Sequence, residues 1–496
     1  MKHILLGFYF MLLGLVALAQ GRTLPSDTMV VTAHQVTIKG KNVPYIAQVG
    51  TQPVWDESGA ISAYLHYTYY ERTDVQDKAS RPLFISFNGG PGSGSVWMHL
   101  AYTGPQILKV DDEGFPIQPY GIKDNPNSIL DVADIVFVNP VNTGYSRIVD
   151  KEADRKAFFG VKADITYLAE WINTFVTRIQ RWESPKYLIG ESYGTTRVSG
   201  LALVLQNSQW MYINGVILVS PTELGVDVGG GGRRSGPLGA ALRVPYFTAA
   251  AWYHEKLPSD LQSKDLLEVL QMSEEYAVQD LLPVLAKGGF VSESERIAAA
   301  DQIAKYSGIS SEVILDYNLD IPTRFYWKEL LREEGFTIGR LDSRYKGIDR
   351  TDGGDAPDFN SELTSWLHSF TPAINHYFST ELNFPTDVKY NMFGPVRPWD
   401  RSGNETGENL RQAMAQNPYL HTLVQSGYYD GATKYFDAKY TMWRIDPSGK
   451  MKDRLSFKGY RSGHMMYLRN EDLIKANDDL RDFIIKTSPG DQPAKY

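Results

Sequence analysis

The chain alternates polar and apolar residues close to its start. Residues 29–38 and 63–70 alternate with a period of two, which is typical of strands with one buried face. Glycine and asparagine turns lie between these runs, so we expect hairpins here. From residue 83 onward the pattern changes to short, nearly continuous apolar runs, which indicate strands buried on both faces: residues 83–87, 135–138, 187–189, 216–219 and 423–425.

Helical patterns separate several of these apolar runs. Residues 161–179 place Ile165, Leu168, Ile172, Phe175 and Ile179 on one face, as an amphipathic helix does. Buried strands that alternate with such helices predict an α/β fold with a mainly parallel central sheet.

The alternation stops between residues 222 and 391. This region holds four glycines (229–232) and several helical patterns, one of them between a capping box at Ser292 and Gly308. Such a long interruption predicts an inserted, mostly helical subdomain. We therefore divide the chain into a signal peptide (1–19), the first part of an α/β domain (20–221), a cap insertion (222–391) and the second part of the α/β domain (392–496).

The first residues resemble a signal peptide. Lys2 and His3 precede an apolar run over residues 4–18, and Ala17 and Ala19 are small residues at the positions that signal peptidase reads. The run is short for a membrane anchor. We expect cleavage after Ala19 and a secreted or periplasmic protein without membrane insertion.

Composition narrows the classes of partner and chemistry. The chain has 496 residues, a formal charge of -8 and no cysteine. The acidity argues against nucleic acid as a partner, and the lack of thiols excludes disulfides, thiolate nucleophiles, iron–sulfur clusters and cysteine-based zinc sites. We expect no cofactor and no metal, whereas the oligomeric state stays open.

One pentapeptide indicates a serine nucleophile. Gly190-Glu-Ser-Tyr-Gly194 fits G-x-S-x-G and stands between a predicted strand and a predicted helix. Glycines in this setting permit a sharp turn that exposes Ser192. Such a serine needs a base and an acid, which follow it in the chain order serine, acid, histidine. Asp430 follows the run 423–425, and His464 lies in a turn-rich segment. Each residue taken alone could simply be part of a turn, but their order after Ser192 favours a catalytic triad.

A glycine-rich loop follows the strand at residues 83–87. Asn88-Gly-Gly-Pro-Gly92 can direct backbone N–H groups toward an oxyanion. A phosphate-binding loop is the competing interpretation, but no G-K-[ST] follows.

Five motifs follow one another along the chain. In order, they are Asn88-Gly-Gly-Pro-Gly92, Val141-Asn-Thr-Gly-Tyr-Ser146, Gly190-Glu-Ser-Tyr-Gly194, Gly427-Tyr-Tyr-Asp430 and Gly463-His-Met465. Together they resemble the serine carboxypeptidase family, peptidase family S10, in a cysteine-free, bacterial-type form. The resemblance implies an α/β-hydrolase fold with an inserted, mostly helical cap.

The resemblance implies catalytic roles for individual residues. Ser192 is the nucleophile, His464 the general base and Asp430 its partner. The backbone N–H groups of Gly90 and Tyr193 form the oxyanion hole.

The resemblance also implies a substrate site. Asn88 and Gly89 of the glycine-rich loop, with Glu191, bind the free C-terminal carboxylate of a peptide, and Met465 lines the pocket of the departing residue. The implied function is an exported serine carboxypeptidase that releases C-terminal residues through an acyl-enzyme. A carboxylate binds to Glu191 only when the two groups share a proton, so we expect activity to favour acidic pH.

Two alternatives accompany this interpretation, and the sequence departs from the family pattern at several positions. The same triad serves a carboxypeptidase-like acyltransferase or an esterase, and a hydrolase scaffold can also carry a non-catalytic binding protein. Relatives commonly have a glutamate where this chain has Tyr102, whose hydroxyl is still able to donate a hydrogen bond. Met466 and Tyr467 stand where Val-Pro is common.

Overall fold

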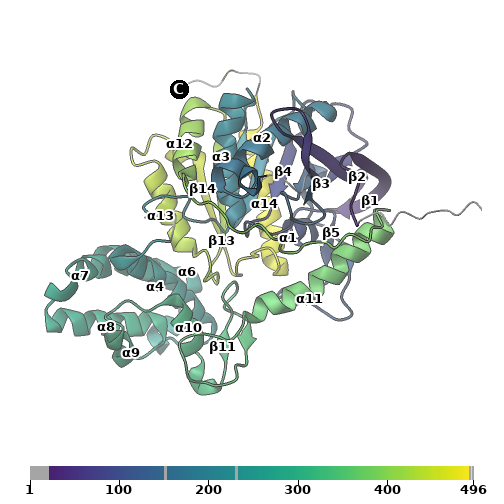
Figure 1. Cartoon of the computed structure of the whole chain (residues 1–496). Helices are drawn as coiled ribbons and strands as arrows, with labels where there is room; N and C mark the ends of the chain where they lie inside the picture. Colours follow the sequence, from purple (N-terminus) through teal and green to yellow (C-terminus); the bar gives the residue numbers. More distant parts are fainter. Residues whose placement is uncertain (1–21, 150–153, 229–232, 491–492, 494–496) are drawn as a thin grey trace, which may run out of the picture.

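The computed structural model of the chain describes residues 22–149, 154–228, 233–490 and 493 (Figure 1). The predicted signal peptide and the four-glycine tract lie outside the described residues. Within the described ranges, no helix is both long and apolar enough to cross a membrane.

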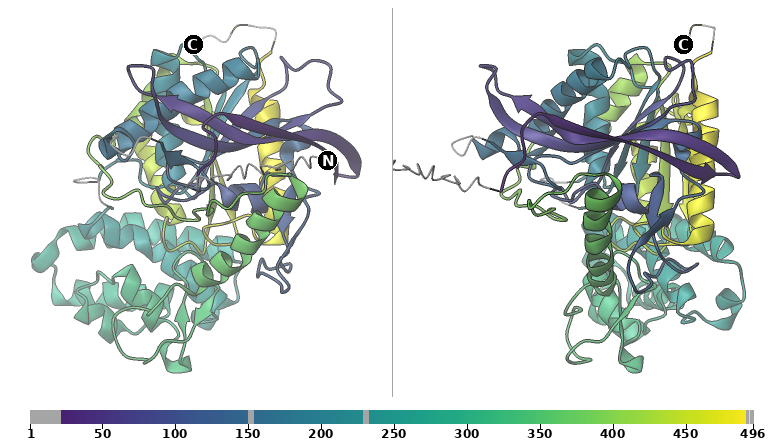
Figure 2. Two further views of the ribbon diagram at one scale, coloured as in Figure 1. Left: turned by 45° about the vertical axis from the view of Figure 1, so that its right-hand side comes forward. Right: turned by 90° about the vertical axis from the view of Figure 1, so that its right-hand side faces the viewer.

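A ten-stranded sheet forms the centre of the molecule (Figure 1). Six neighbouring strands, β7, β4, β9, β10, β13 and β14, run parallel to one another. Strands β1 to β3 add an antiparallel edge, and these long strands are seen in Figure 2. The predicted α/β fold with a mainly parallel sheet is confirmed. In spatial order the strands are β1 (Thr28–Ile38), β2 (Lys41–Trp55), β3 (Ile61–Arg72), β7 (Asp134–Val138), β4 (Leu83–Phe87), β9 (Lys186–Glu191), β10 (Gly215–Val219), β13 (His421–Gly427) and β14 (Leu455–Tyr460), and β8 (Arg147–Ile148) pairs with β3.

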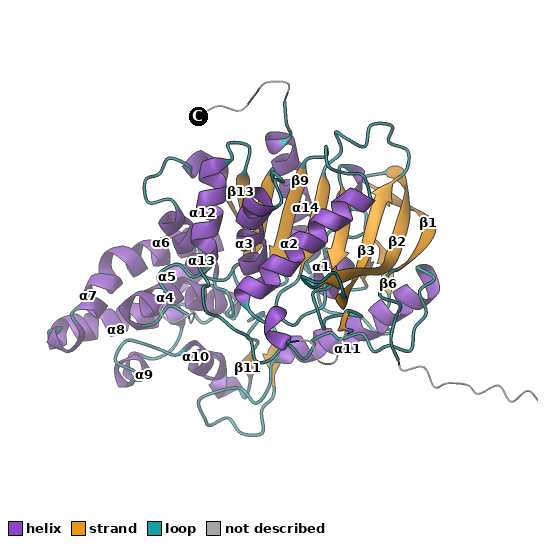
Figure 3. Ribbon diagram, turned by 45° about the horizontal axis from the view of Figure 1, so that its top comes forward, coloured by secondary structure: helices purple, strands orange, loops and turns teal. Residues whose placement is uncertain are grey.

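Helices cover both faces of the sheet (Figure 3). Successive side chains of a strand point to opposite faces, so in β9 Leu188 packs into one core while Tyr187 and Ile189 pack into the other. The core of Leu188 includes α2 (Val161–Arg178), α3 (Tyr193–Ser208), α12 (Thr406–Gln416) and α13 (Tyr435–Ile445), and the second core includes α1 (Val96–Ala101) and α14 (Asn470–Thr487).

A mostly helical region lies between β10 and β13, on one side of the sheet domain in Figure 2. The helix predicted after Ser292 is α8, which has the capping box and ends at Gly308 with a φ of 72°. The region contains α4 (Gly236–Tyr253), α5 (Ser259–Gln262), α6 (Leu266–Tyr276), α7 (Leu282–Ala286), α8 (Glu293–Ser307), α9 (Ser311–Asp316), α10 (Thr323–Glu329), β11 (Thr337–Ile338), β12 (Lys346–Gly347) and α11 (Ser361–His376). Its predicted bounds, 222–391, stay a prediction.

The remaining elements are short. They are β5 (Gln106–Leu108), β6 (Ile122–Asp124) and the single turns η1 (Ile129–Asp131), η2 (Arg155–Ala157), η4 (Ala277–Leu281), η5 (Gly288–Phe290), η6 (Arg332–Glu334), η7 (Tyr377–Glu381) and η8 (Lys452–Arg454).

A buried ion pair supports the glycine-rich loop after β4. Arg197 of α3 donates from Nε to Asp164 Oδ2 of α2 at 2.7 Å, and neither side chain is exposed. The same guanidinium donates to the carbonyl oxygen of Asn88 at 2.7 Å and to that of Pro91 at 3.4 Å. Two helices and the loop are thereby held by one charged group.

We predict that Asp164→Ala lowers the free energy of unfolding by about 3–5 kcal/mol, because it leaves the buried Arg197 charge without its partner. Urea denaturation measures this. The matched control is Asp27→Ala, which removes an exposed 2.9 Å ion pair with Arg178 and is expected to cost less than about 1 kcal/mol. Equal losses in the two variants would contradict the structural role of the buried pair.

Candidate active site

Ser192 occupies a tight turn between β9 and α3. Its φ of 58° and ψ of -125° lie outside the regions that residues with a Cβ normally adopt. Glycine is needed on both sides of this turn. A Cβ on Gly190 would collide with the carbonyl of Gly194, and one on Gly194 would lie 2.8 Å from the carbonyl oxygen of Phe87. The G-x-S-x-G pattern therefore reflects close packing, which presents Ser192 at the end of the sheet.

His464 and Asp430 meet beside this turn. Asp430 follows β13 and His464 follows β14, and because these strands are parallel neighbours their following loops lie at the same edge. Nδ1 of His464 lies 2.6 Å from Oδ2 of Asp430, and both side chains are buried. The backbone N–H groups of Ala432 and Thr433 donate to Asp430 Oδ1 at 2.7 and 3.0 Å, which fixes the carboxylate.

Two hydroxyl groups that the sequence did not reveal also hold the histidine. Thr433 Oγ1 lies 2.7 Å from Asp430 Oδ2 and 3.1 Å from His464 Nδ1, and Ser220 Oγ donates to the carbonyl oxygen of His464 at 2.7 Å. Only the spacing of Thr433, three residues after the aspartate, could have indicated this contact. Burial opposes a charge on His464, but the carboxylate of Asp430 outweighs it and raises the pKa of the imidazole.

The two backbone groups predicted for an oxyanion hole lie on adjoining segments. Tyr193 is the first residue of α3, so its N–H has no acceptor within the helix. Gly90 has a φ of 106°, which favours glycine. Gly89 packs directly against the serine turn, where an added Cβ would lie 2.5 Å from the backbone nitrogen of Tyr193. This contact brings the glycine-rich loop to the serine turn.

Glu191, the last residue of β9, carries a buried carboxyl group beside Ser192. Burial raises its pKa to about 7, although the nearby His464 and hydrogen bonds from Tyr467 and Asn88 favour the anion. The hydroxyl of Tyr467 donates a short hydrogen bond to Glu191 Oε2. Asn88 accepts from the backbone N–H of Met98 at 3.0 Å, while its Nδ2 has no hydrogen bond of regular geometry to any described residue.

Tyr102 does not contact Glu191 through its hydroxyl, contrary to the role that the sequence left open for it. Its hydroxyl donates to Gln425 Oε1 at 2.6 Å, and its ring stacks on that of Tyr467 with 4.8 Å between the centroids. Tyr467 therefore supplies the hydroxyl partner of Glu191. The sequence does show that Tyr467 departs from the family pattern. It does not show that the side chain of Tyr467 lies next to Glu191.

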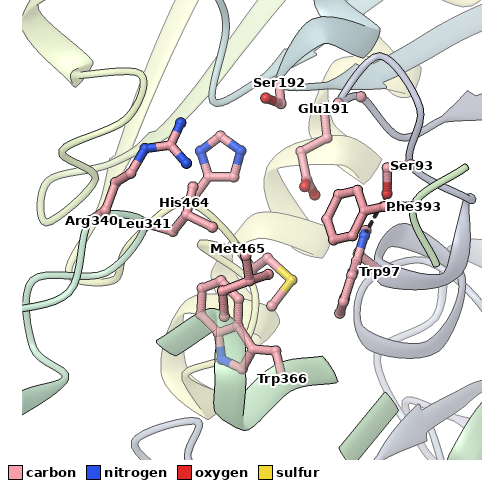
Figure 4. A pocket seen from close by; sticks show the side chains of 13 residues that line it. Ser93, Trp97, Glu191, Ser192, Arg340, Leu341, Trp366, Phe393, His464 and Met465 are labelled. Atoms are coloured by element: carbon pink, nitrogen blue, oxygen red, sulfur yellow. Dashed lines mark hydrogen bonds between the residues drawn. The ribbon is translucent and has the colours of Figure 1, made fainter. Parts of the chain in front are cut away.

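A cavity of about 200 Å³ opens at Ser192, which we call the glutamate pocket (Figure 4). Figure 4 shows Glu191 on one side of it and Arg340 on the other, with His464 between them. Met465 lies in its wall. The other apolar residues of the wall are Trp97, Leu341, Leu363, Trp366 and Phe393.

A segment of the mostly helical region between β10 and β13, which we call the cap region, holds the loops that carry Asp430 and His464. The backbone N–H of Gly431 donates to the carbonyl oxygen of Arg340 at 3.0 Å, and that of His464 donates to the carbonyl oxygen of Leu341 at 2.7 Å. The cap region thus contributes to the site through its backbone as well as through its side chains. No motif in the insertion indicated this contact.

The fold, the serine turn and the adjoining histidine and aspartate define the class of the protein as an α/β-hydrolase. In the described part of the chain, no three histidine or acidic side chains gather closely enough to hold a metal ion. Residues 55–220 match the sequence profile of the serine carboxypeptidase family. Over these residues the chain is similar to that family.

Known relatives match only part of the chain. Serine carboxypeptidase-like 36 of Arabidopsis thaliana is 26% identical over 167 residues, which cover 32% of each chain. The pheromone-processing carboxypeptidase KEX1 of Kluyveromyces lactis is 34% identical over 116 residues, covering 23% of this chain and 16% of the relative. The matched segments thus span about a third or less of these relatives.

A solved structure shows the same fold over most of the chain. It is that of a prohormone-processing carboxypeptidase from Saccharomyces cerevisiae, with a TM-score of 0.50 and 14% sequence identity. The alignment covers 91% of this chain and 93% of the yeast chain.

We predict that an organophosphate labels Ser192 stoichiometrically and that mass spectrometry places the adduct on the peptide containing residue 192. Ser192→Ala is expected to abolish labelling, and Asp430→Asn to slow it by about 10³-fold or more, because His464 loses the acceptor that orients it. Ser199→Ala, which changes a buried serine of α3 away from the pocket, is the control. Labelling that persists in Ser192→Ala would contradict the assignment of the nucleophile.

Proposed function

We propose that the protein is an exported serine carboxypeptidase, which removes C-terminal residues from peptides. The observation that carries the proposal is the buried Glu191 carboxyl group beside Ser192, with the side chain of Asn88 near it. A protonated carboxyl group at this position can donate a hydrogen bond to a substrate carboxylate. Export rests on the sequence of the first nineteen residues.

The proposed reaction forms and then hydrolyses an acyl-enzyme. His464 Nε2 accepts the proton of Ser192 Oγ as that oxygen attacks the carbonyl carbon of the last peptide bond. The N–H groups of Gly90 and Tyr193 stabilise the oxyanion. His464 then transfers the proton to the nitrogen of the departing amino acid as the C–N bond breaks. His464 deprotonates a water molecule as it attacks the acyl carbon, and it then returns the proton to Ser192 Oγ as the ester bond breaks and the shortened peptide leaves.

The terminal carboxylate is bound by two donors in this proposal. Neutral Glu191 donates its proton to one carboxylate oxygen, and Asn88 Nδ2 donates to the carboxylate as well. Tyr467 occupies Glu191 Oε2, which leaves the other carboxyl oxygen for the substrate. Binding requires the protonated form of Glu191, because two adjacent carboxylates repel each other.

The sign of the pH effect follows from this requirement. Glu191 is neutral below its pKa of about 7 and becomes an anion above it. The Michaelis constant is therefore lowest in acid and rises above pH 7, by about tenfold per pH unit in the limit of a single ionisation. The requirement for a neutral His464 acts in the opposite direction and limits the rate in acid.

We predict that Tyr467→Phe shifts the alkaline rise of the Michaelis constant to higher pH. The tyrosine hydroxyl favours the Glu191 anion, so its removal raises the pKa of Glu191 further. Tyr102→Phe is the matched control, since its hydroxyl bonds to Gln425. The pH dependence of the Michaelis constant for a blocked dipeptide measures both. An unshifted rise in Tyr467→Phe would show that Glu191 does not control binding.

We also predict that blocked dipeptides with a free C-terminal carboxylate are cleaved at least about 10²-fold more efficiently than the same compounds amidated at the C-terminus. The amide cannot accept the Glu191 proton as a carboxylate does. Glu191→Gln keeps a hydrogen-bond donor but carries no titrating proton, so it is expected to abolish the alkaline rise. Equal cleavage of acids and amides would favour an esterase or endopeptidase.

An acyltransferase or esterase would use the same triad. Product analysis in the presence of an added alcohol or amine distinguishes acyl transfer from hydrolysis. A non-catalytic binding protein would take up no organophosphate at Ser192.

A further inference from the structure

A second cavity, of about 230 Å³, also opens at Ser192, and Glu191 does not line it. It shares Gly90, Ser192, Arg340 and Leu341 with the glutamate pocket, but it extends along Tyr193 instead of Glu191. We call this second cavity the arginine pocket.

The arginine pocket lies where the retained part of a substrate must lie. In the proposed function the departing residue occupies the glutamate pocket, with its carboxylate at Glu191. The scissile carbonyl sits at Ser192, so the chain that precedes it continues to the opposite side. That side is the arginine pocket.

The charge of this cavity is positive, although the whole chain carries a formal charge of -8. Three arginines line it, Arg233, Arg340 and Arg401, whereas Glu223 is its one acidic lining residue among those described. A pocket with an excess of two positive charges attracts an anion.

Arg340 is the arginine closest to the chemistry, because it lines both cavities. Its guanidinium makes no ion pair and donates no hydrogen bond within the described ranges. Burial, followed by the like charge of Arg233, lowers its pKa below the ordinary value, although Asp430 and Glu362 act in the opposite direction. Figure 4 shows this guanidinium on the His464 side of the site, across from Glu191.

The acidic groups near Arg340 form hydrogen bonds with other residues. Asp430 bonds to His464. Glu362 Oε1 accepts from the backbone N–H of Leu341 at 2.8 Å, and burial raises its pKa to about 7, so in acid it is neutral. Among the described residues, neither group forms an ion pair with the guanidinium.

We propose that the arginine pocket binds a carboxylate on the retained part of the substrate, and that the enzyme therefore prefers an aspartate or glutamate immediately before the residue it releases. Guanidinium groups recognise carboxylates through charge-assisted, often bidentate hydrogen bonds. This inference rests on the proposed carboxypeptidase function and specifies its substrate class.

Four N-blocked dipeptides that end in phenylalanine test the preference, with glutamate, glutamine, lysine or alanine before it. At pH 6 we expect kcat/KM to be about tenfold higher for glutamate than for glutamine, and lowest for lysine. The advantage of glutamate over glutamine is expected to disappear as the pH falls through about 4.3, where the substrate side chain becomes neutral.

Variants of the lining residues test the cause of the preference. Arg340→Gln removes a positive charge from the pocket, so it is expected to reduce the ratio of kcat/KM for glutamate over glutamine to about one to threefold. Glu223→Gln removes a negative charge and is expected to increase this ratio. Arg324→Gln makes the same change of charge at an exposed position outside the pocket and is expected to leave the ratio unchanged. Since each ratio compares two substrates on one variant, a general loss of activity does not alter its meaning.

The outcomes separate this inference from the function on which it rests. If none of the four dipeptides is cleaved, the carboxypeptidase proposal fails. If the alanine and glutamine compounds are cleaved without preference for glutamate, the arginine pocket does not bind a carboxylate and this inference alone is overturned. A preference for lysine would show that Glu223 dominates the pocket and would equally overturn it.

Discussion

The burial of one carboxyl group, that of Glu191 next to Ser192, is the constraint on which the rest of the site depends. A carboxylate at this position would oppose the negative charge that develops when a serine attacks a carbonyl. Burial favours the neutral form and moves the pKa to about 7, while Tyr467 and Asn88 moderate that effect. With this pKa, the Glu191 carboxyl group can gain or lose its proton near neutral pH. In the proposed function that proton is what distinguishes a free C-terminus from any other acyl compound.

The fold supplies this arrangement at the end of its parallel strands, where the loops after β4, β9, β13 and β14 come together. The buried pair of Asp164 and Arg197 holds the loop after β4 through its carbonyl groups. From the other side, the backbone at Arg340 and Leu341 fixes the loops of Asp430 and His464. The site is therefore assembled from the sheet domain and the cap region together, and the cap region contributes Arg233 and Arg340 to the arginine pocket.

Sequence patterns predicted the parts of the fold that are buried and regular. The five apolar runs are strands, and residues 161–179 form a helix, because full burial leaves a clear pattern. β14 was missed, since its residues lie at the edge of the sheet and are only partly buried. Motifs located Ser192, Asp430 and His464, but they could not show that Tyr467 rather than Tyr102 reaches Glu191. That choice depends on Gln425, which accepts the Tyr102 hydroxyl from a strand more than three hundred residues away. The position of Arg340 beside the site could not be predicted either, since it belongs to no motif in the insertion.

The most direct test of the account is the uptake of protons when a peptide carboxylate binds. Isothermal titration calorimetry of a blocked dipeptide into Ser192→Ala at pH 8, in buffers of different ionisation enthalpy, gives the number of protons taken up without turnover. The account predicts an uptake approaching one proton, because Glu191, with a pKa of about 7, must be protonated to bind. The same titration of Ser192→Ala combined with Glu191→Gln is expected to show none. Binding of the dipeptide to Ser192→Ala without proton uptake would contradict the central role of Glu191.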